Sequence, residues 1–315
     1  MLRVSFVLMV LSCVGFAAAA QGVPLEITYL SDPVIAQVSY RLFQAGQPPN
    51  DGQLWLWVKV QNIGKGGAGG SKLAVIVTTD VTGPKPVLLF AKQDVPPIVA
   101  EGEVEVALVP LGPWEDLRNG CCVILVVDAP VAGKPLGQLP EGAKGERNNG
   151  FVLFLAPSYD KKTLTNPAVI QDSSSLPLLW PDLIIDEVGF KIEPGSGDFR
   201  LHKFWVGIQN IGPRYADISR VAIFILSDVT GPAPASLFGT ALVSGIDRDQ
   251  GLKVLVSRWF SADLRECCVI AVIDAPVTGK PLGQLAEKVE RNNGFAFFLT
   301  PSYELQTIPN PAFGK

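Results

Sequence analysis

Charge and histidine are both scarce in this 315-residue sequence. Charged residues make up 18% of the chain, the formal net charge is -4, and there is one His. A weakly acidic chain has no basic surface for a phosphate backbone, which argues against nucleic acid as a partner. The one histidine, His202, aligns with Leu54 on the inward face of a predicted strand, which indicates a core position rather than a general base. We therefore predict no catalytic residues, no enzyme activity and no cofactor.

Long hydrophobic runs are absent after the N-terminus. Residues 1–20 read MLRVSFVLMVLSCVGFAAAA, with basic Arg3, an apolar run over 4–16 and small residues at the end. This order is that of a secretory signal peptide, and the run is shorter than the roughly 20 apolar residues of a membrane anchor. We expect cleavage after Ala20 and no membrane span in the mature chain. Localisation is then secreted, periplasmic or cell-surface.

One long stretch occurs twice. The segment CCVILVVDAPVAGKPLGQL beginning at Cys121 returns as CCVIAVIDAPVTGKPLGQL beginning at Cys267. Other matches, such as Asn62 with Asn210, keep nearly the same spacing. A repeat of this length exceeds a solenoid unit and predicts two tandem globular domains. We place them at 21–160 and 180–304, with a linker at 161–179 and a C-terminal tail at 305–315.

Helical periodicity is also lacking, whereas short alternating segments are common. The chain is 48% apolar and contains 31 Gly and 26 Pro, which is typical of many short strands joined by turns. In 54–61, Leu54 and Leu56 lie on one face and Trp55 and Trp57 on the other. Predicted strands are 54–61, 72–78, 104–108, 123–127 and 150–155, and 202–209, 220–226, 252–256, 269–273 and 294–299. With six or seven strands per copy, the predicted fold is all-β, with two β-sandwiches.

Four short motifs of the second copy resemble the bacterial cell-adhesion-related domain called CARDB. They are Pro181-Asp182-Leu183, Asn210-Ile211-Gly212, Val272-Ile273-Asp274, and the series Glu287, Glu290, Asn292 and Asn293. The first copy matches three of them but lacks Pro-Asp-Leu, and is the more degenerate member. The resemblance implies tandem immunoglobulin-like sandwiches in secreted or surface proteins, with no activity of their own.

The acidic residues before each Asn-Asn-Gly allow two interpretations. Hard oxygen ligands for calcium would be Asp128, Glu141, Glu146 and Asn148 in one copy, and Asp274, Glu287, Glu290 and Asn292 in the other. Turn chemistry is the simpler explanation, because Asn tolerates the left-handed conformation and Gly follows it. We favour the turn, since calcium loops usually space their ligands more densely.

Two adjacent cysteines begin the predicted 123–127 and 269–273 strands. The pairs are Cys121 with Cys122 and Cys267 with Cys268. Neighbours in an extended strand face opposite sides, so a bond within a pair would need irregular geometry. An oxidising compartment favours disulfides, between copies or between molecules. Vicinal bridges, buried free thiols and, least supported, a zinc site remain alternatives.

The two tryptophans at equivalent positions, Trp57 and Trp205, lie on the outward faces of their predicted strands. An outward Trp can stack on a sugar or anchor a partner protein, but another layer can equally cover it. Trp114 and Trp259 precede the Cys pairs in predicted loops and are candidates of the same kind.

Two further motifs recur in both copies. Asp-Val-Thr-Gly-Pro at Asp80 and Asp228 is predicted to be a turn, with a docking loop as the alternative. Gly-Lys-Pro-Leu-Gly-Gln-Leu begins at Gly133 and Gly279 and lacks the context of a phosphate-binding loop. Its identity in both copies is explained by recent duplication or by a shared role.

These features together predict a protein that acts by contact. Adhesion, scaffolding or spacing through contacts with an envelope protein is the expected function. Carbohydrate binding to a surface polysaccharide by Trp57 and Trp205 is the alternative, and a redox role of the Cys pairs comes last. For the contact function, duplication raises avidity, because two weak faces share one chain.

Overall fold

The computed structural model describes residues 30–42, 53–111, 119–139, 149–156, 158, 160–165, 180–196, 199–232, 234–260, 267–285, 293–299 and 304–310. Within these ranges the regular elements are all β-strands, eight in each copy. The same residues hold no helix that is long and apolar enough to cross a membrane. The predicted signal peptide lies outside the described residues.

The first copy forms two four-stranded sheets. Its strands are β1 (Pro33–Leu42), β2 (Leu54–Asn62), β3 (Ser71–Thr78), β4 (Leu89–Val95), β5 (Glu103–Leu111), β6 (Cys121–Val126), β7 (Gly150–Leu155) and β8 (Lys162–Thr165). One sheet has the order β5-β2-β1-β8 and the other β4-β3-β6-β7. We call them the outer and the inner sheet of the first copy.

The second copy repeats this arrangement. Its strands are β9 (Leu183–Pro194), β10 (Arg200–Asn210), β11 (Ser219–Leu226), β12 (Ala235–Val243), β13 (Gly251–Phe260), β14 (Cys267–Val272), β15 (Gly294–Leu299) and β16 (Gln306–Pro309). The outer sheet is β13-β10-β9-β16 and the inner sheet β12-β11-β14-β15. In each copy the first, second and fifth strands share one sheet, and the third, fourth, sixth and seventh share the other. Two antiparallel sheets in each copy make the all-β, β-sandwich architecture that was predicted.

Local pattern located ten of the sixteen strands, and the ones it missed are β1, β4, β8, β9, β12 and β16. The predicted strands 150–155 and 294–299 coincide with β7 and β15. β8 lies inside the predicted linker and β16 inside the predicted tail, so the first sandwich extends to Thr165 and the second to Pro309. These two strands have four residues each, and pairing with β1 and β9 holds them in the outer sheets. Such pairing is not visible in a short local pattern.

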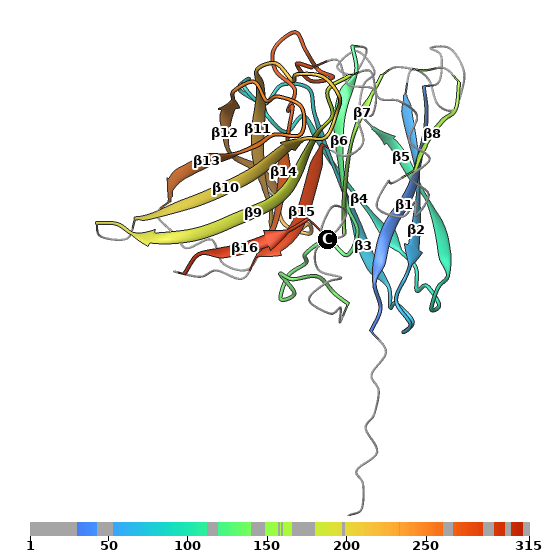
Figure 1. Ribbon diagram of the computed structural model, residues 1–315. Coiled ribbons are helices and arrows are strands. Elements are labelled where there is room, and N and C mark those ends of the chain that lie inside the picture. Colours follow the sequence, from blue (N-terminus) through green and yellow to red (C-terminus); the bar gives the residue numbers. More distant parts are fainter. Residues whose placement is uncertain are drawn as a thin grey trace, which may run out of the picture.

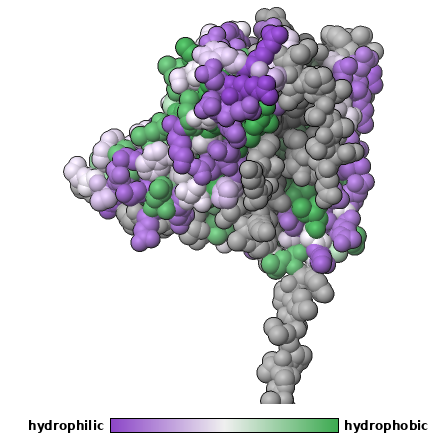
Figure 2. Space-filling model, in the orientation of Figure 1, coloured by the Kyte–Doolittle hydropathy of each residue, from purple (hydrophilic) through white to green (hydrophobic). Residues whose placement is uncertain are grey.

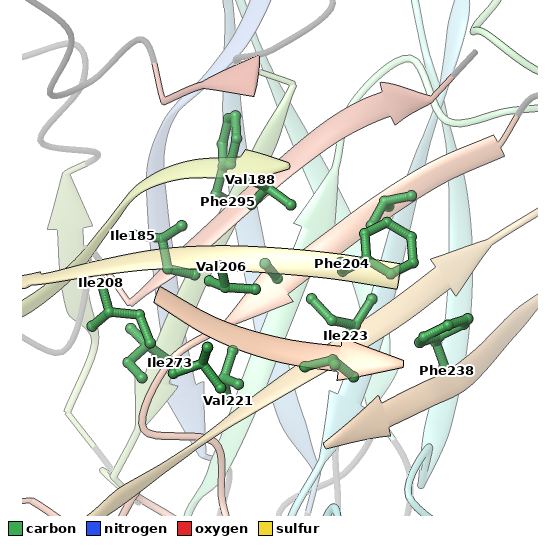
Figure 3. Packing of buried hydrophobic residues seen from close by; sticks show 14 of the residues in the cluster. Ile185, Val188, Phe204, Val206, Ile208, Val221, Ile223, Phe238, Ile273 and Phe295 are labelled. Atoms are coloured by element: carbon green, nitrogen blue, oxygen red, sulfur yellow. The ribbon is translucent and has the colours of Figure 1, made fainter. Parts of the chain in front are cut away.

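Each sandwich encloses its own apolar core. In the second copy, Phe204 and Val206 from the outer sheet face Val221 and Ile223 from the inner sheet (Figure 3), and all four are fully buried. The first copy has the equivalent core between its two sheets. Alternation produces this arrangement, since every second residue of an outer strand faces inward.

A third apolar cluster joins the two copies. It contains Ile76, Ile124 and Val152 from the inner sheet of the first copy, and Phe224 and Ile270 from that of the second. The molecule is therefore a stack of four sheets, with the two inner sheets packed against each other and the outer sheets at the two ends (Figure 1). The sequence predicted two tandem domains but not that their inner sheets pack against each other.

The double coverage explains why the inner strands look continuously apolar. β6 and β14 are buried at all six positions. One face of each strand packs in its own sandwich and the other packs against the sister copy, so neither face has to be polar. By contrast, β2 alternates strictly between buried and half-buried residues.

Candidate binding surfaces

The Asn-x-Gly motif holds together one end of each sandwich. The buried side chain of Asn62 accepts hydrogen bonds from the backbone amides of Asp32 and Gly64, at 2.9 and 3.1 Å. Asn210 accepts in the same way from Asp182 and Gly212. Asp32 therefore occupies the position of Asp182, although the sequence around it lacks Pro-Asp-Leu. These motif residues stabilise the fold and do not form an open site.

The aspartates of the Val-x-Asp motif organise the loop that follows them. The fully buried carboxylate of Asp128 accepts hydrogen bonds from the amides of Gln138 and Leu139 at 2.9 to 3.0 Å. Asp274 does the same for Gln284 and Leu285. Both aspartates have φ near +50°, the left-handed region in which Asp is tolerated.

Burial has a large effect on the acidity of these aspartates. It raises the pKa of the Asp274 carboxyl to about 6, although the amide hydrogen bonds and the charge of Lys280 act in the opposite direction. The pKa of Asp128 is also raised by burial. Each of these carboxylates accepts hydrogen bonds from backbone amides of the loop that follows it.

The calcium alternative depends mostly on residues outside the described ranges. Among the proposed ligands, the described ones are Asp128 and Asp274; Glu141, Glu146, Asn148, Glu287, Glu290 and Asn292 lie outside the described residues. Within the described part of the chain, no three His, Cys, Asp or Glu side chains come together as a metal site.

The four cysteines of the described ranges are buried, and none of them forms a disulfide. Cys121 packs inside the first sandwich and Cys122 in the cluster between the copies, so the predicted opposite orientation is confirmed. The favoured disulfides are not formed, and the thiols act as small apolar residues. Burial raises the pKa of Cys121 and of Cys267 to about 12. A thiolate is the reactive species in redox chemistry, so these thiols are poorly suited to it.

The repeated turns are contacts between the copies. The amide of Val81 donates to the carbonyl of Pro276, and the amide of Val229 donates to Pro130, both at 2.9 Å. The hydroxyl of Thr278 also donates to the Asp80 carboxylate at 2.6 Å. Asp80 also accepts from the Thr82 amide, as a turn residue does. The segment is therefore both the predicted turn and a docking loop for the sister copy.

The Gly-Lys-Pro-Leu-Gly-Gln-Leu loops contribute to the same interface. Leu136 and Leu282 pack against the cluster between the copies. Gly137 and Gly283 have φ of +95° and +89°, and a Cβ at either would overlap the carboxylate of Asp128 or Asp274. The identical sequence of these loops thus has a shared structural role in both copies.

His202 is a core residue, as predicted. It is fully buried on the inward face of β10. Its ring lies between Phe190 and Phe260, with centroid separations of 6.3 and 5.7 Å. This apolar setting is inside the sandwich and away from any surface that a substrate could reach.

The outer sheet of the first copy presents a tryptophan pair. Trp55 and Trp57 are half-buried on the outward face of β2, and their ring centroids are 6.1 Å apart. The Lys161 ammonium lies 4.9 Å from the centre of the Trp57 ring, a cation–π contact. Lys59 and Glu103 form an ion pair of 2.9 Å nearby.

The outer sheet of the second copy presents two tryptophans that are farther apart. Trp205 is half-buried on the outward face of β10, beside Leu255 of β13. Trp259 lies on the same face of β13 and is 54% exposed. Trp259 was expected in a loop, but the strand continues to Phe260 and includes it. Trp114 lies outside the described residues.

Sequence reasoning missed the neighbours of Trp205. Leu255 and Leu305 are 45% and 59% exposed. Leu255 lies in register beside Trp205. Leu305 lies near Gly189, the register partner of Trp205 on the other side. The alternation Lys253, Leu255, Ser257, Trp259 is the signal that extends this strand beyond 252–256. Leu305 had no comparable signal, because it precedes a strand of four residues.

Comparisons with known proteins assign the chain to no family. No family model matches it, and no curated protein matches it either. Among solved structures it is similar to red sea bream transglutaminase, with 13% sequence identity and a TM-score of 0.22, over 78% of this chain and 29% of that chain. Likeness at this level supports no functional inference.

Proposed function

We propose that the protein is a non-catalytic envelope module that acts by contact, as an adhesion, scaffold or spacer element, through protein contacts. The observation that carries the proposal is the outward Trp55–Trp57 pair on the outer sheet of the first copy. Aromatic residues are enriched at the centre of protein interfaces, and Trp is enriched among the residues that contribute most to binding. The predicted signal peptide and the resemblance to CARDB support the same function.

The stack of four sheets suits a spacer. The outer faces lie at opposite ends of the stack (Figure 1), and the copies share a buried apolar cluster. Two binding faces held in this way keep a set separation and orientation, which reduces the entropic cost of binding both partners.

A photo-crosslinking amino acid at Trp57 tests the proposal. The full-length mature chain with this substitution is irradiated in the envelope fraction of the producing organism, and adducts are identified by mass spectrometry. We expect one specific protein to be captured at Trp57 and not at Val99, an exposed loop residue of the same copy. Equal, unspecific labelling at both positions contradicts the proposal.

Carbohydrate binding is a second candidate function. It is favoured by the shared outward face of Trp205 and Trp259, because two aromatic rings on one face of a sheet can stack on two rings of one glycan.

A further inference from the structure

The outward face of the second copy's outer sheet has two aromatic positions separated by a polar row. Trp205 of β10 lies in register beside Leu255 of β13 and Gly189 of β9. Farther along the sheet, Trp259 of β13 lies in register beside Leu201 of β10. Four residues along β13 separate the two positions, which places the two tryptophan Cα atoms about 14 Å apart at ordinary strand rise and spacing.

Polar side chains that can form hydrogen bonds lie between the two tryptophans. Lys203 pairs in register with Lys191 and with Ser257. The Lys203 ammonium lies 2.5 Å from a carboxylate oxygen of Glu193, and Lys191 lies 3.7 Å from the other oxygen. The ion pairs hold both donors and acceptors on the surface between the two aromatic rings.

The charges on this face balance. Lys253 forms a further ion pair of 2.5 Å with Glu187. Lys191, Lys203 and Lys253 are thus matched by Glu187, Glu193 and the exposed Asp186. Figure 2 shows hydrophilic residues with apolar ones between them on the visible side of the second copy. A balanced surface favours neither a polyanion nor a polycation, and so complements an uncharged ligand.

The first copy differs at the equivalent positions. Trp57 pairs with Ser39 and Ala107, where Trp205 pairs with Gly189 and Leu255. The Lys161 ammonium lies over the Trp57 ring. The hydroxyls of Ser39 and Thr163 are hydrogen-bonded to each other. A positive side chain thus occupies the ring face that a sugar would need. The corresponding neighbour in the second copy is the apolar Leu305, beside Gly189.

We propose that the outer face of the β13-β10-β9-β16 sheet binds an uncharged polysaccharide. Pyranose rings stack with their C–H faces on Trp205 and Trp259, because the aromatic faces are electron-rich and apolar. Hydroxyls between the two stacked rings exchange hydrogen bonds with Lys203, Glu193 and Lys191, which supply donors and acceptors together. This inference rests on the second candidate function, carbohydrate binding, and deepens it by assigning a face of the second copy and a class of ligand.

Affinity electrophoresis of the full mature chain tests the site. The gels contain hydroxyethyl cellulose, glucomannan, galactomannan or mixed-linkage β-glucan, and one gel contains anionic polygalacturonate. We expect at least one neutral polymer to retard the protein, and Trp259→Ala to weaken this binding at least tenfold. Trp205→Ala has the same effect, whereas Trp57→Ala leaves retardation unchanged. Melting temperatures confirm that the variants are folded, and Trp259 is exposed enough for its truncation to be tolerated.

Several outcomes overturn the inference. They are no retardation by any neutral polymer, retardation by polygalacturonate alone, or equal loss in the Trp57→Ala variant. Protein adducts from a photo-crosslinker at Trp259, without glycan binding, assign this face to a protein partner instead. Crosslinking at Trp57 is independent of the Trp205→Ala and Trp259→Ala substitutions, so failure of the glycan site is distinguishable from failure of the contact function.

Discussion

Gly150 of β7 lies directly against Ala296 of β15, and Gly294 of β15 lies against Val152 of β7 in the same way. Equivalent residues exchange roles in these contacts, as they do in the paired bonds of Val81 and Val229. Reciprocal contacts of this kind are those of an isologous dimer interface. The two copies of one chain therefore pack as two subunits of a symmetric dimer would.

The glycines at this crossing are predicted to be intolerant of any side chain. A Cβ at Gly150 would overlap that of Ala296, so Gly150→Ala should destabilise the protein by about 1–3 kcal/mol. The matched control is Gly189→Ala in β9, where the new Cβ would meet its nearest atoms at 3.5 Å. That substitution should be neutral or stabilise by up to about 1 kcal/mol. Urea unfolding measures both, and equal effects would disprove the close approach.

The cluster between the copies should make the molecule unfold as a unit. Phe224 is fully buried there, so Phe224→Ala is expected to cost about 3–5 kcal/mol. Calorimetry of the wild type should show a single transition, since neither sandwich keeps its inner face covered without the other. Phe204→Ala, within one sandwich core, is the matched control of similar cost. Two well-separated wild-type transitions would contradict the shared core.

Stability should increase as the pH falls from 7 to 5. The pKa of Asp274 is about 6 in the folded protein, against an ordinary value of 3.8. The folded state therefore binds a proton in a window where the unfolded chain does not, which adds about 1 kcal/mol of unfolding free energy by pH 5. Asp128 acts in the same direction.

Urea titrations at several pH values measure this dependence, and Asp274→Asn should remove part of it. Asp80 does not oppose the effect in this window. Burial alone would raise its pKa, but hydrogen bonds from Thr278, Thr82 and Gly83 lower it overall. The stability that ionised Asp80 contributes is lost only when the pH falls below 3.8, the ordinary pKa of Asp. A flat or opposite profile between pH 7 and 5 would count against the buried carboxylates.

The cysteines should be unreactive in the folded state. With the pKa of Cys121 and Cys267 near 12, about one thiol in 10⁵ is ionised at pH 7, and burial blocks access as well. Ellman's reagent should detect no thiol in the native mature protein and all four after unfolding in guanidinium without reductant. Fewer than four after unfolding would indicate disulfides and restore the oxidised alternative.

Local sequence patterns were sufficient for the fold class and for many of the strands. The alternation in β2 and β10 predicted their inward and outward faces correctly, including the core position of His202. Of the residues on the proposed glycan-binding face, Trp205 was predicted to point outward, and it does. Leu305 was not found, because its position depends on β16 pairing with β9, a contact between residues more than a hundred positions apart.

By itself the sequence determined the all-β class, the duplication and the two faces of each outer strand, because these follow from periodicities of two residues and of one repeat. Only the tertiary structure decided what covers the inner strands. An entirely apolar strand such as β14 indicates burial on both faces, but its pattern is the same whether the second cover is a helix layer, another chain or a sister domain. In this protein the second cover is the sister copy. The outer sheets therefore keep one face exposed to solvent.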